Sequence, residues 1–222
     1  MIFTSLYKKL AYTFKDQTLL QCALTHCSAG SPNNERYEFL GDSILSMVIA
    51  GALLERFPQQ TEGELSQLRA YLVNGEMLAN IAMTLNLGQY MYLGQGELKS
   101  GGKQRASILA DALEAIFAAI FLDADFSATQ ASILHLYKTY IDDPLLLNNI
   151  KDAKTQLQEY AQQKKYSLPH YQLDHIDGVN HNQTFYVNCT INKHTAVGAG
   201  ETRRKAEQNA AKNLLITLKF NL

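Results

Sequence analysis

Carboxylates recur at helical spacing in NNERYEFLGDSIL, residues 33–45, which sets Glu35, Glu38 and Asp42 among aromatic and aliphatic residues. Successive residues of an α-helix turn by about 100°, so a helix here would hold the three acids within about 60° of one another. Like charges on one face repel, and their burial is costly unless a cation pairs them. The spacing therefore predicts either a solvated acidic face or a cation site.

A second acidic pair lies in ILADALEAIFAAIFL, residues 108–122, where Asp111 and Glu114 are the only polar residues. A helix that is apolar almost all round is a buried helix, and residues three apart share one face. No Lys or Arg lies within this segment. If it packs against the first acidic helix, Glu38, Asp42, Asp111 and Glu114 can converge.

A cluster of this kind becomes tolerable when divalent cations lie between the oxygens. All-oxygen ligation selects Mg²⁺ or Mn²⁺ over zinc, which usually recruits His or Cys. The alternatives are that each acid meets a basic group from elsewhere in the chain, or that the first helix is solvated. Two acidic pairs together, one of them in so apolar a helix, favour the metal site.

The composition predicts a folded protein. At 222 residues, 46% hydrophobic and 18% charged, the chain can bury a core. We expect no stretch long and apolar enough to span a bilayer, and the N-terminal MIFTSLYKKLAYTF lacks the apolar region of a signal peptide. Cys22, Cys27 and Cys189 show no metal-site spacing, which indicates reduced thiols in a cytoplasmic protein.

Charge and periodicity divide the chain into two parts. Residues 1–150 hold ten basic and fifteen acidic residues, whereas residues 151–222 hold ten and six. Up to residue 141 the pattern is helical, and Thr61 with Glu64 predicts a capping box. Pro144 and its polar neighbours break the pattern, so we expect a linker at 142–151 between domains at 3–141 and 152–222.

The second part changes period from helical to alternating. AKTQLQEYAQQ is amphipathic, QTFYVNCTI alternates as a half-buried strand, SLPHYQLDHI and HTAVGAG can form two more strands, and TRRKAEQNAAKNLLITL closes the domain as a helix. The expected fold class is therefore an all-α domain followed by a small α+β domain of order αβββα.

These stretches resemble a known family. NERYEFLGDSIL resembles the signature of the ribonuclease III family, and ELKSGG followed by SILADALEAIFAAIFLD resembles its second conserved region, within a signature core at 3–125. KTQLQEY and GAGETRRKAEQNAA resemble its C-terminal double-stranded RNA-binding domain. The resemblance implies a Mg²⁺-dependent endoribonuclease for which Mn²⁺ can substitute. It cuts double-stranded RNA, leaves 5′-phosphate and 3′-hydroxyl ends with two-nucleotide 3′ overhangs, works as a homodimer, and matures ribosomal RNA precursors and some messenger and transfer RNAs.

The resemblance also implies site residues. Glu38, Asp111 and Glu114 should hold metal, joined by Asp42, and Asp42 and Glu114 should be the acids most needed for chemistry. Glu35 and Glu62 fall at accessory acidic positions near substrate or subunit contacts, although an acid in a first helical turn, such as Glu62, is also explained by the helix dipole.

The RNA-binding part carries its own candidates. The first helix carries a polar stripe that suits 2′-hydroxyls, formed by Thr155, Gln158, Glu159 and Gln162. A loop histidine, His181, would enter the next minor groove. A basic cluster at a helix N-terminus would meet phosphates and consists of Arg203, Arg204 and Lys205. Ala153 and Val179 depart from the family pattern, in which Pro is usual at both places.

Two competing functions share these features. One is a non-catalytic double-stranded RNA-binding or ribosome-assembly protein on the same fold, against which the retained carboxylates argue. The other is a helical di-metal hydrolase of small nucleotides, against which the RNA-binding tail argues.

Overall fold

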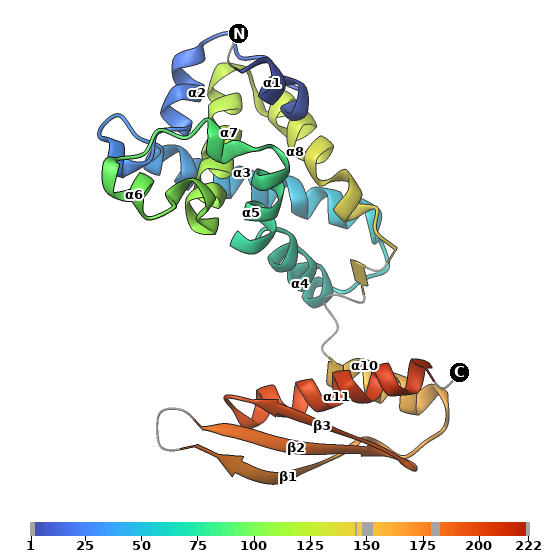
Figure 1. Cartoon of the computed structure of the whole chain (residues 1–222). Helices are drawn as coiled ribbons and strands as arrows, with labels where there is room; N and C mark the ends of the chain where they lie inside the picture. The colour runs from blue at the N-terminus through green and yellow to red at the C-terminus, as the bar shows by residue number, and fades with distance from the viewer. Residues whose placement is uncertain (1–2, 145, 148–152, 179–182, 221–222) are drawn as a thin grey trace. The chain divides into compact units, whose positions relative to one another are not determined.

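The computed structural model describes residues 3–144, 146–147, 153–178 and 183–220, and it divides into two compact units, 1–146 and 147–222. Element labels follow Figure 1. The N-terminal unit is helical within its described residues, with these elements: α1 (Thr4–Leu10), α2 (Gln17–Ala23), η1 (Cys27–Ala29), α3 (Glu35–Arg56), α4 (Glu62–Leu72), α5 (Gly75–Thr84), η2 (Leu87–Gln89), α6 (Gln95–Lys99), η3 (Gly102–Gln104), α7 (Ala106–Asp123) and α8 (Phe126–Ile141).

Helix α7 is the centre of this unit, as its apolar sequence predicts. It packs against α3, α5, α2 and α8, and its residues from Ile108 to Ile120 are buried apart from Asp111 and Glu114, which are half-buried. Fully buried alanines on α7, such as Ala115 and Ala119, let neighbouring helices approach closely. The most apolar helix of the unit therefore carries two of its acids.

Helix α3 corrects one expectation. It has 22 residues and a window of mean hydropathy 1.4, so by length and composition alone it could cross a membrane. It packs along α7, and six of its residues are buried there or nearby: Gly41, Ile44, Leu45, Val48, Ile49 and Leu53. We interpret α3 as a core helix of a folded protein, because the core helices of such proteins pass the same test.

Helix caps divide residues 63–87, which lie within the part of the chain whose pattern is helical, into two helices. Thr61 and Glu64 form the predicted capping box at the start of α4. A break follows at Val73, because the Asn74 side chain accepts a hydrogen bond from the Met77 N–H and starts α5. Asn is among the strongest N-cap residues, so a new helix begins where periodicity alone would continue the first.

The C-terminal unit has the predicted αβββα order. Helices α10 (Ala153–Gln163) and α11 (Arg203–Phe220) cover one face of an antiparallel sheet of order β1-β2-β3, formed by β1 (His170–Asp177), β2 (Thr184–Ile191) and β3 (His194–Gly200) (Figure 1). The alternating β2 residues Val187, Cys189 and Ile191 are buried against α11, and Leu157 and Ala161 of α10 complete the core. The expected fold class is thus confirmed for both units.

Candidate active site and RNA-binding surface

Three carboxylates from two helices meet in the N-terminal unit. Glu38 of α3 and Asp111 and Glu114 of α7 each offer an oxygen, and these oxygens lie within 4.8 Å of one another. All three side chains are half-buried. Ligand oxygens about 2.1 Å from an octahedral Mg²⁺ lie about 3 to 4 Å apart, so small side-chain adjustments would let the three acids share one cation.

The electrostatics of the cluster show that the acids repel. Burial, followed by the negative charges of Asp42, Glu38 and Asp111, raises the pKa of Glu114 to about 8. Burial also raises the pKa of Glu38, with Asp111, Glu35 and Asp42 adding to the shift. Every charge that shifts the pKa of Glu38 or Glu114 is therefore negative, and a divalent cation would supply the missing positive charge.

The structure places Asp42 beside the three acids. Its side chain is exposed, and it exerts the largest charge effect on the pKa of Glu114. Glycine at position 41 explains the proximity, because a Cβ there would overlap the carbonyl oxygen of Glu114. The helices α3 and α7 therefore touch through their backbones one residue before Asp42.

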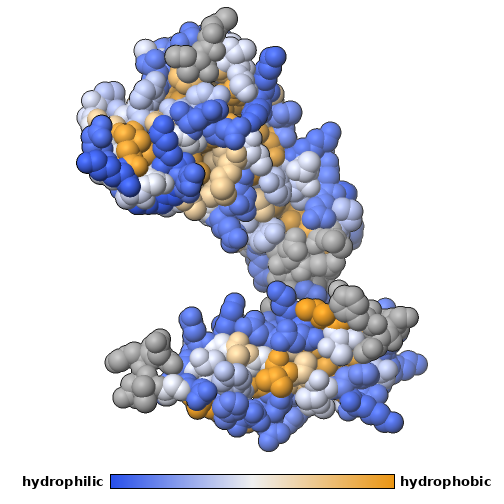
Figure 2. Space-filling model, in the orientation of Figure 1, coloured by the Kyte–Doolittle hydropathy of each residue, from blue (hydrophilic) through white to orange (hydrophobic). Residues whose placement is uncertain are grey.

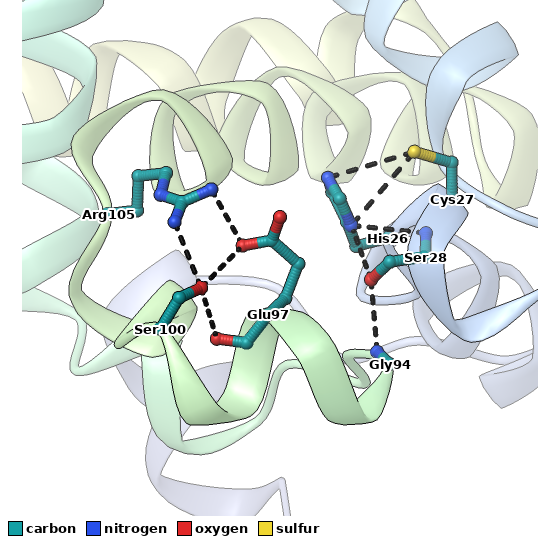
Figure 3. Close-up of polar contacts among 7 residues, drawn as sticks. All are labelled: His26, Cys27, Ser28, Gly94, Glu97, Ser100 and Arg105. Atoms are coloured by element: carbon teal, nitrogen blue, oxygen red, sulfur yellow. Dashed lines mark hydrogen bonds and ion pairs between the residues drawn. The ribbon is translucent and has the colours of Figure 1, made fainter.

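His26 is a neighbour of the cluster that the sequence did not reveal. Burial raises the pKa of Asp111, and the nearby His26 opposes that rise. The His26 Nδ1 accepts a hydrogen bond from the Ser28 N–H at 3.2 Å and lies 2.8 Å from the Ser28 hydroxyl, which also accepts the Gly94 N–H at 3.0 Å (Figure 3). Because Nδ1 accepts the Ser28 N–H, the neutral ring carries its proton on Nε2.

An ion pair fixes the entry to α7. Arg105, the residue that precedes this helix, places Nη1 2.7 Å from the Glu97 carboxylate and donates from Nη2 to the Ser100 hydroxyl at 3.1 Å (Figure 3). The contacts tie α6 to the start of the helix that carries Asp111 and Glu114. Glu97 lies in the ELKSGG stretch, so the family resemblance of that stretch is the sequence signal for this residue.

The C-terminal unit presents a polar helix face and a basic helix terminus. Exposed residues of α10 include Thr155, Gln158, Glu159 and Gln162. At the start of α11, Arg203, Arg204 and Lys205 are exposed. His181 and Val179 lie outside the described residues, so the predicted loop contact is not placed.

Glu207 pairs with two basic side chains near the start of α11. Its carboxylate accepts from the Arg203 Nε at 3.1 Å and from the Lys154 Nζ at 2.7 Å, which joins α11 to α10. Among the described residues, Arg204 makes no side-chain hydrogen bond or ion pair. Arg203 is therefore partly neutralised, whereas Arg204 presents its whole charge to solvent.

Comparisons with known proteins agree with this division. A family model described as Ribonuclease-III-like matches residues 16–141, and the Double-stranded RNA binding motif matches residues 153–218. The chain is 57% identical over 212 residues to a protein named Ribonuclease 3 from Legionella pneumophila (strain Lens), covering 95% of each chain. It is 49% identical to Ribonuclease 3 of Wigglesworthia glossinidia brevipalpis over all of this chain and 98% of the relative.

The chain belongs to the ribonuclease III family. Among solved structures, one match is the nuclease domain of ribonuclease III from Campylobacter jejuni, in a structure that concerns flexibility in a region involved in dimer formation. The TM-score is 0.60 and the sequence identity is 46%, and the match covers 62% of this chain and 96% of that chain. The ribonuclease III fold thus accounts for the helical unit.

The structure distinguishes among the acids that the ribonuclease III resemblance selects. Glu38, Asp111 and Glu114 lie together, with Asp42 beside them. Glu35 is exposed on the first turn of α3 and acts electrostatically on Glu38. Glu62 lies apart from the three clustered acids: it accepts a hydrogen bond from the Ser66 hydroxyl at 2.7 Å and lines a cavity between α3 and α4.

Proposed function

We propose that the protein is a Mg²⁺-dependent endoribonuclease that hydrolyses phosphodiester bonds in double-stranded RNA. The observation that carries the proposal is the convergence of Glu38, Asp111 and Glu114 from two helices, in a chain that also contains a double-stranded RNA-binding motif. The catalytic part comprises residues 3–141, residues 142–151 form the linker, and residues 152–222 bind RNA.

The acids have distinct parts in this reaction. Glu38, Asp111 and Glu114 would hold the cation, and their oxygen-only donor set fits Mg²⁺ or Mn²⁺. When bound, the cation lowers the pKa of water and offsets the charge of the scissile phosphate. Asp42, exposed beside Glu114, would accept a hydrogen bond from water that approaches the phosphate. Glu35 adds charge at the edge of the site.

Duplex recognition belongs to the C-terminal unit. The polar face of α10 suits the 2′-hydroxyls of a minor groove, and the helix dipole at the start of α11 reinforces the phosphate attraction of Arg204 and Lys205. His181 would enter the adjacent minor groove. Such contacts read the shape of the RNA duplex more than its sequence.

We infer that the protein forms a homodimer through the exposed face of α3. In the view of Figure 2, hydrophobic areas interrupt the hydrophilic surface of the N-terminal unit. Apart from what that view shows, three large apolar residues of α3 are exposed: Phe39, Met47 and Leu54, by 79%, 64% and 64%. Their spacing keeps them within about 80° of one another. Leu54 and Glu62 also line a cavity of about 480 Å³ that an apolar side chain of a second copy could enter.

Two facing active sites would explain the product. Dimeric cleavage of both strands leaves 5′-phosphate and 3′-hydroxyl ends with two-nucleotide 3′ overhangs, as expected for the family. The cellular substrates would be precursors of ribosomal RNA and some messenger and transfer RNAs in the cytoplasm. Three free cysteines agree with a reducing compartment.

The test is cleavage of an RNA hairpin. We expect staggered products with Mg²⁺ and none with EDTA, and no cleavage of single-stranded RNA. Binding without cleavage in Mg²⁺ and in Mn²⁺ would instead identify a non-catalytic RNA-binding protein. Sedimentation of the wild type and of Met47→Glu tests the dimer, because a charge on the α3 face should yield monomers.

A further inference from the structure

Tyr137 of α8 packs its ring into the core of the N-terminal unit, but its hydroxyl has no evident role there. Its side chain is fully buried, and among the described residues its hydroxyl has no hydrogen-bond partner. A buried hydroxyl without a partner is unfavourable, and natural proteins contain few of them. We therefore expect the Tyr137 hydroxyl to gain a hydrogen-bond partner in the functional state of the protein.

The α7–α8 hairpin places Tyr137 and Glu114 at similar distances from the connection between the two helices. Only Ala124 and Asp125 join the two helices, which pack against each other. Glu114 lies nine residues before the end of α7, and Tyr137 lies eleven residues after the start of α8. At about 1.5 Å per residue, both lie about 14 to 17 Å from the connection, at a similar depth in the unit.

The electrostatics agree with this placement. Burial raises the pKa of Tyr137, and the negative charge of Glu114 is the next largest cause, ahead of Tyr140. The acids that surround Glu114 come from α3 and from α7 itself, whereas Tyr137 belongs to the third packed helix, α8. Tyr137 thus approaches from an element that contributes no acid to the cluster.

Glu114 needs a hydrogen-bond donor of this kind. Asp42, Glu38 and Asp111 offer only acceptor oxygens when ionised, so none of them can orient the ionised carboxylate. A carboxylate that binds a cation is commonly held in place by a hydrogen bond to its remaining lone pairs, and that bond strengthens metal affinity. A neutral tyrosine hydroxyl can donate this bond without competing for the site as a positive charge would.

We propose that Tyr137 is a positioning residue whose hydroxyl donates a hydrogen bond to the Glu114 carboxylate, directly or through one water, when the acids hold a divalent cation. The proposal rests on the proposed metal site and deepens it. Tyr137 touches neither RNA nor the reacting atoms; it sets the position of Glu114.

The test compares Tyr137→Phe with a matched control. Tyr7→Phe removes another buried hydroxyl without a partner among the described residues, and the charge that acts on Tyr7 is that of Asp123, outside the cluster. Both substitutions keep the ring. Binding of Mn²⁺ alone to the full chain is measured by electron paramagnetic resonance of the free ion, and melting temperatures are recorded with and without Mn²⁺.

The expected result is a 10- to 100-fold weaker Mn²⁺ affinity in Tyr137→Phe. Its melting temperature without cation should equal or slightly exceed that of the wild type, because an unpaired buried hydroxyl has been removed. Tyr7→Phe should keep the wild-type affinity. At saturating Mn²⁺, hairpin cleavage by Tyr137→Phe should return to within a few-fold of the wild type.

Two results would overturn the role of Tyr137. One is wild-type Mn²⁺ affinity in Tyr137→Phe. The other is a melting temperature of Tyr137→Phe that lies as far below that of the wild type without Mn²⁺ as with it, which would mean that the hydroxyl stabilises the fold. If the wild type itself binds no Mn²⁺ and cuts no hairpin, the proposed function fails as well, so the two failures are distinguishable.

Discussion

Gly41 of α3 and Glu114 of α7 are in backbone contact: the Cβ that Gly41 lacks would overlap the carbonyl oxygen of Glu114. Asp42 follows Gly41, so this one contact sets the separation of the Asp42 and Glu114 carboxylates. It also explains why a helix-weakening residue stands in the middle of a long helix.

Gly41→Ala should therefore separate the two helices. Overpacking of this kind costs about 1–3 kcal/mol of unfolding free energy, and hairpin cleavage should fall with it. Gly51→Ala is the control, because it lies on the same helix with nothing within 4 Å of the added Cβ and should stabilise by up to about 1 kcal/mol. Urea denaturation measures the unfolding free energy of both variants. An equal gain in unfolding free energy in Gly41→Ala and Gly51→Ala would show that the contact between Gly41 and Glu114 is not tight.

The metal-free protein should lose stability as the pH rises. Glu114 has an ordinary pKa of 4.5 and a folded pKa of about 8. Between these values the folded state holds a proton that the unfolded state releases, so this contribution is complete below about pH 4.5 and is lost as the pH approaches 8.

Melting temperatures in EDTA should consequently fall between pH 5 and pH 8, and less steeply in Glu114→Gln, which has no proton to lose. Identical pH slopes for the two proteins would show that Glu114 is not held in a repulsive, buried cluster.

Mg²⁺ should raise the melting temperature of the protein without RNA. A ligand that binds only the folded state stabilises it by about 2.7 kcal/mol at a hundredfold excess over its Kd. An Asp111→Ala, Glu114→Ala double variant should lose most of this gain. Scanning calorimetry decides the point, and an equal Mg²⁺ effect in both proteins would place the cation elsewhere.

Neutral replacement of Arg203 and Arg204 should weaken binding to all duplexes alike, because phosphate contacts carry no base information. The slope of log affinity against log salt should become shallower by roughly one to two units. Arg204→Gln alone should contribute more than Arg203→Gln, because Glu207 already pairs with Arg203. An unchanged slope in the double variant would mean that another surface holds the RNA.

Sequence patterns predicted the features that depend on one element at a time. The apolar run around Asp111 and Glu114 indicated a buried helix, and the alternation ending at Ile191 indicated a strand; both are present. The cap at Asn74 does not show in the hydrophobic pattern, because periodicity does not register one side chain that starts a new helix.

The convergence of acids from α3 and α7 could be predicted, because each helix carries its own spacing of carboxylates. Relationships between elements that leave no such pattern could not. His26 acts on Asp111 from a loop 85 residues earlier in the sequence, and Tyr137 and Glu114 reach a similar depth only because two helices form a hairpin. Neither residue has a neighbour in sequence that signals its partner, since these relationships exist only after packing.

Whether the half-buried acids catalyse cleavage of double-stranded RNA is tested by comparing the wild type with Glu114→Gln on one RNA hairpin at saturating Mg²⁺. The amide keeps the shape of the side chain and removes the charge that holds the cation. We expect staggered products from the wild type, less than a tenth of that rate from Glu114→Gln, and nearly equal hairpin affinity for both. A tenth of the rate corresponds to about 1.4 kcal/mol in the barrier. A Glu114→Gln variant that cuts faster than this, or a wild type that binds the hairpin and leaves it whole, would show that these acids do not carry the reaction.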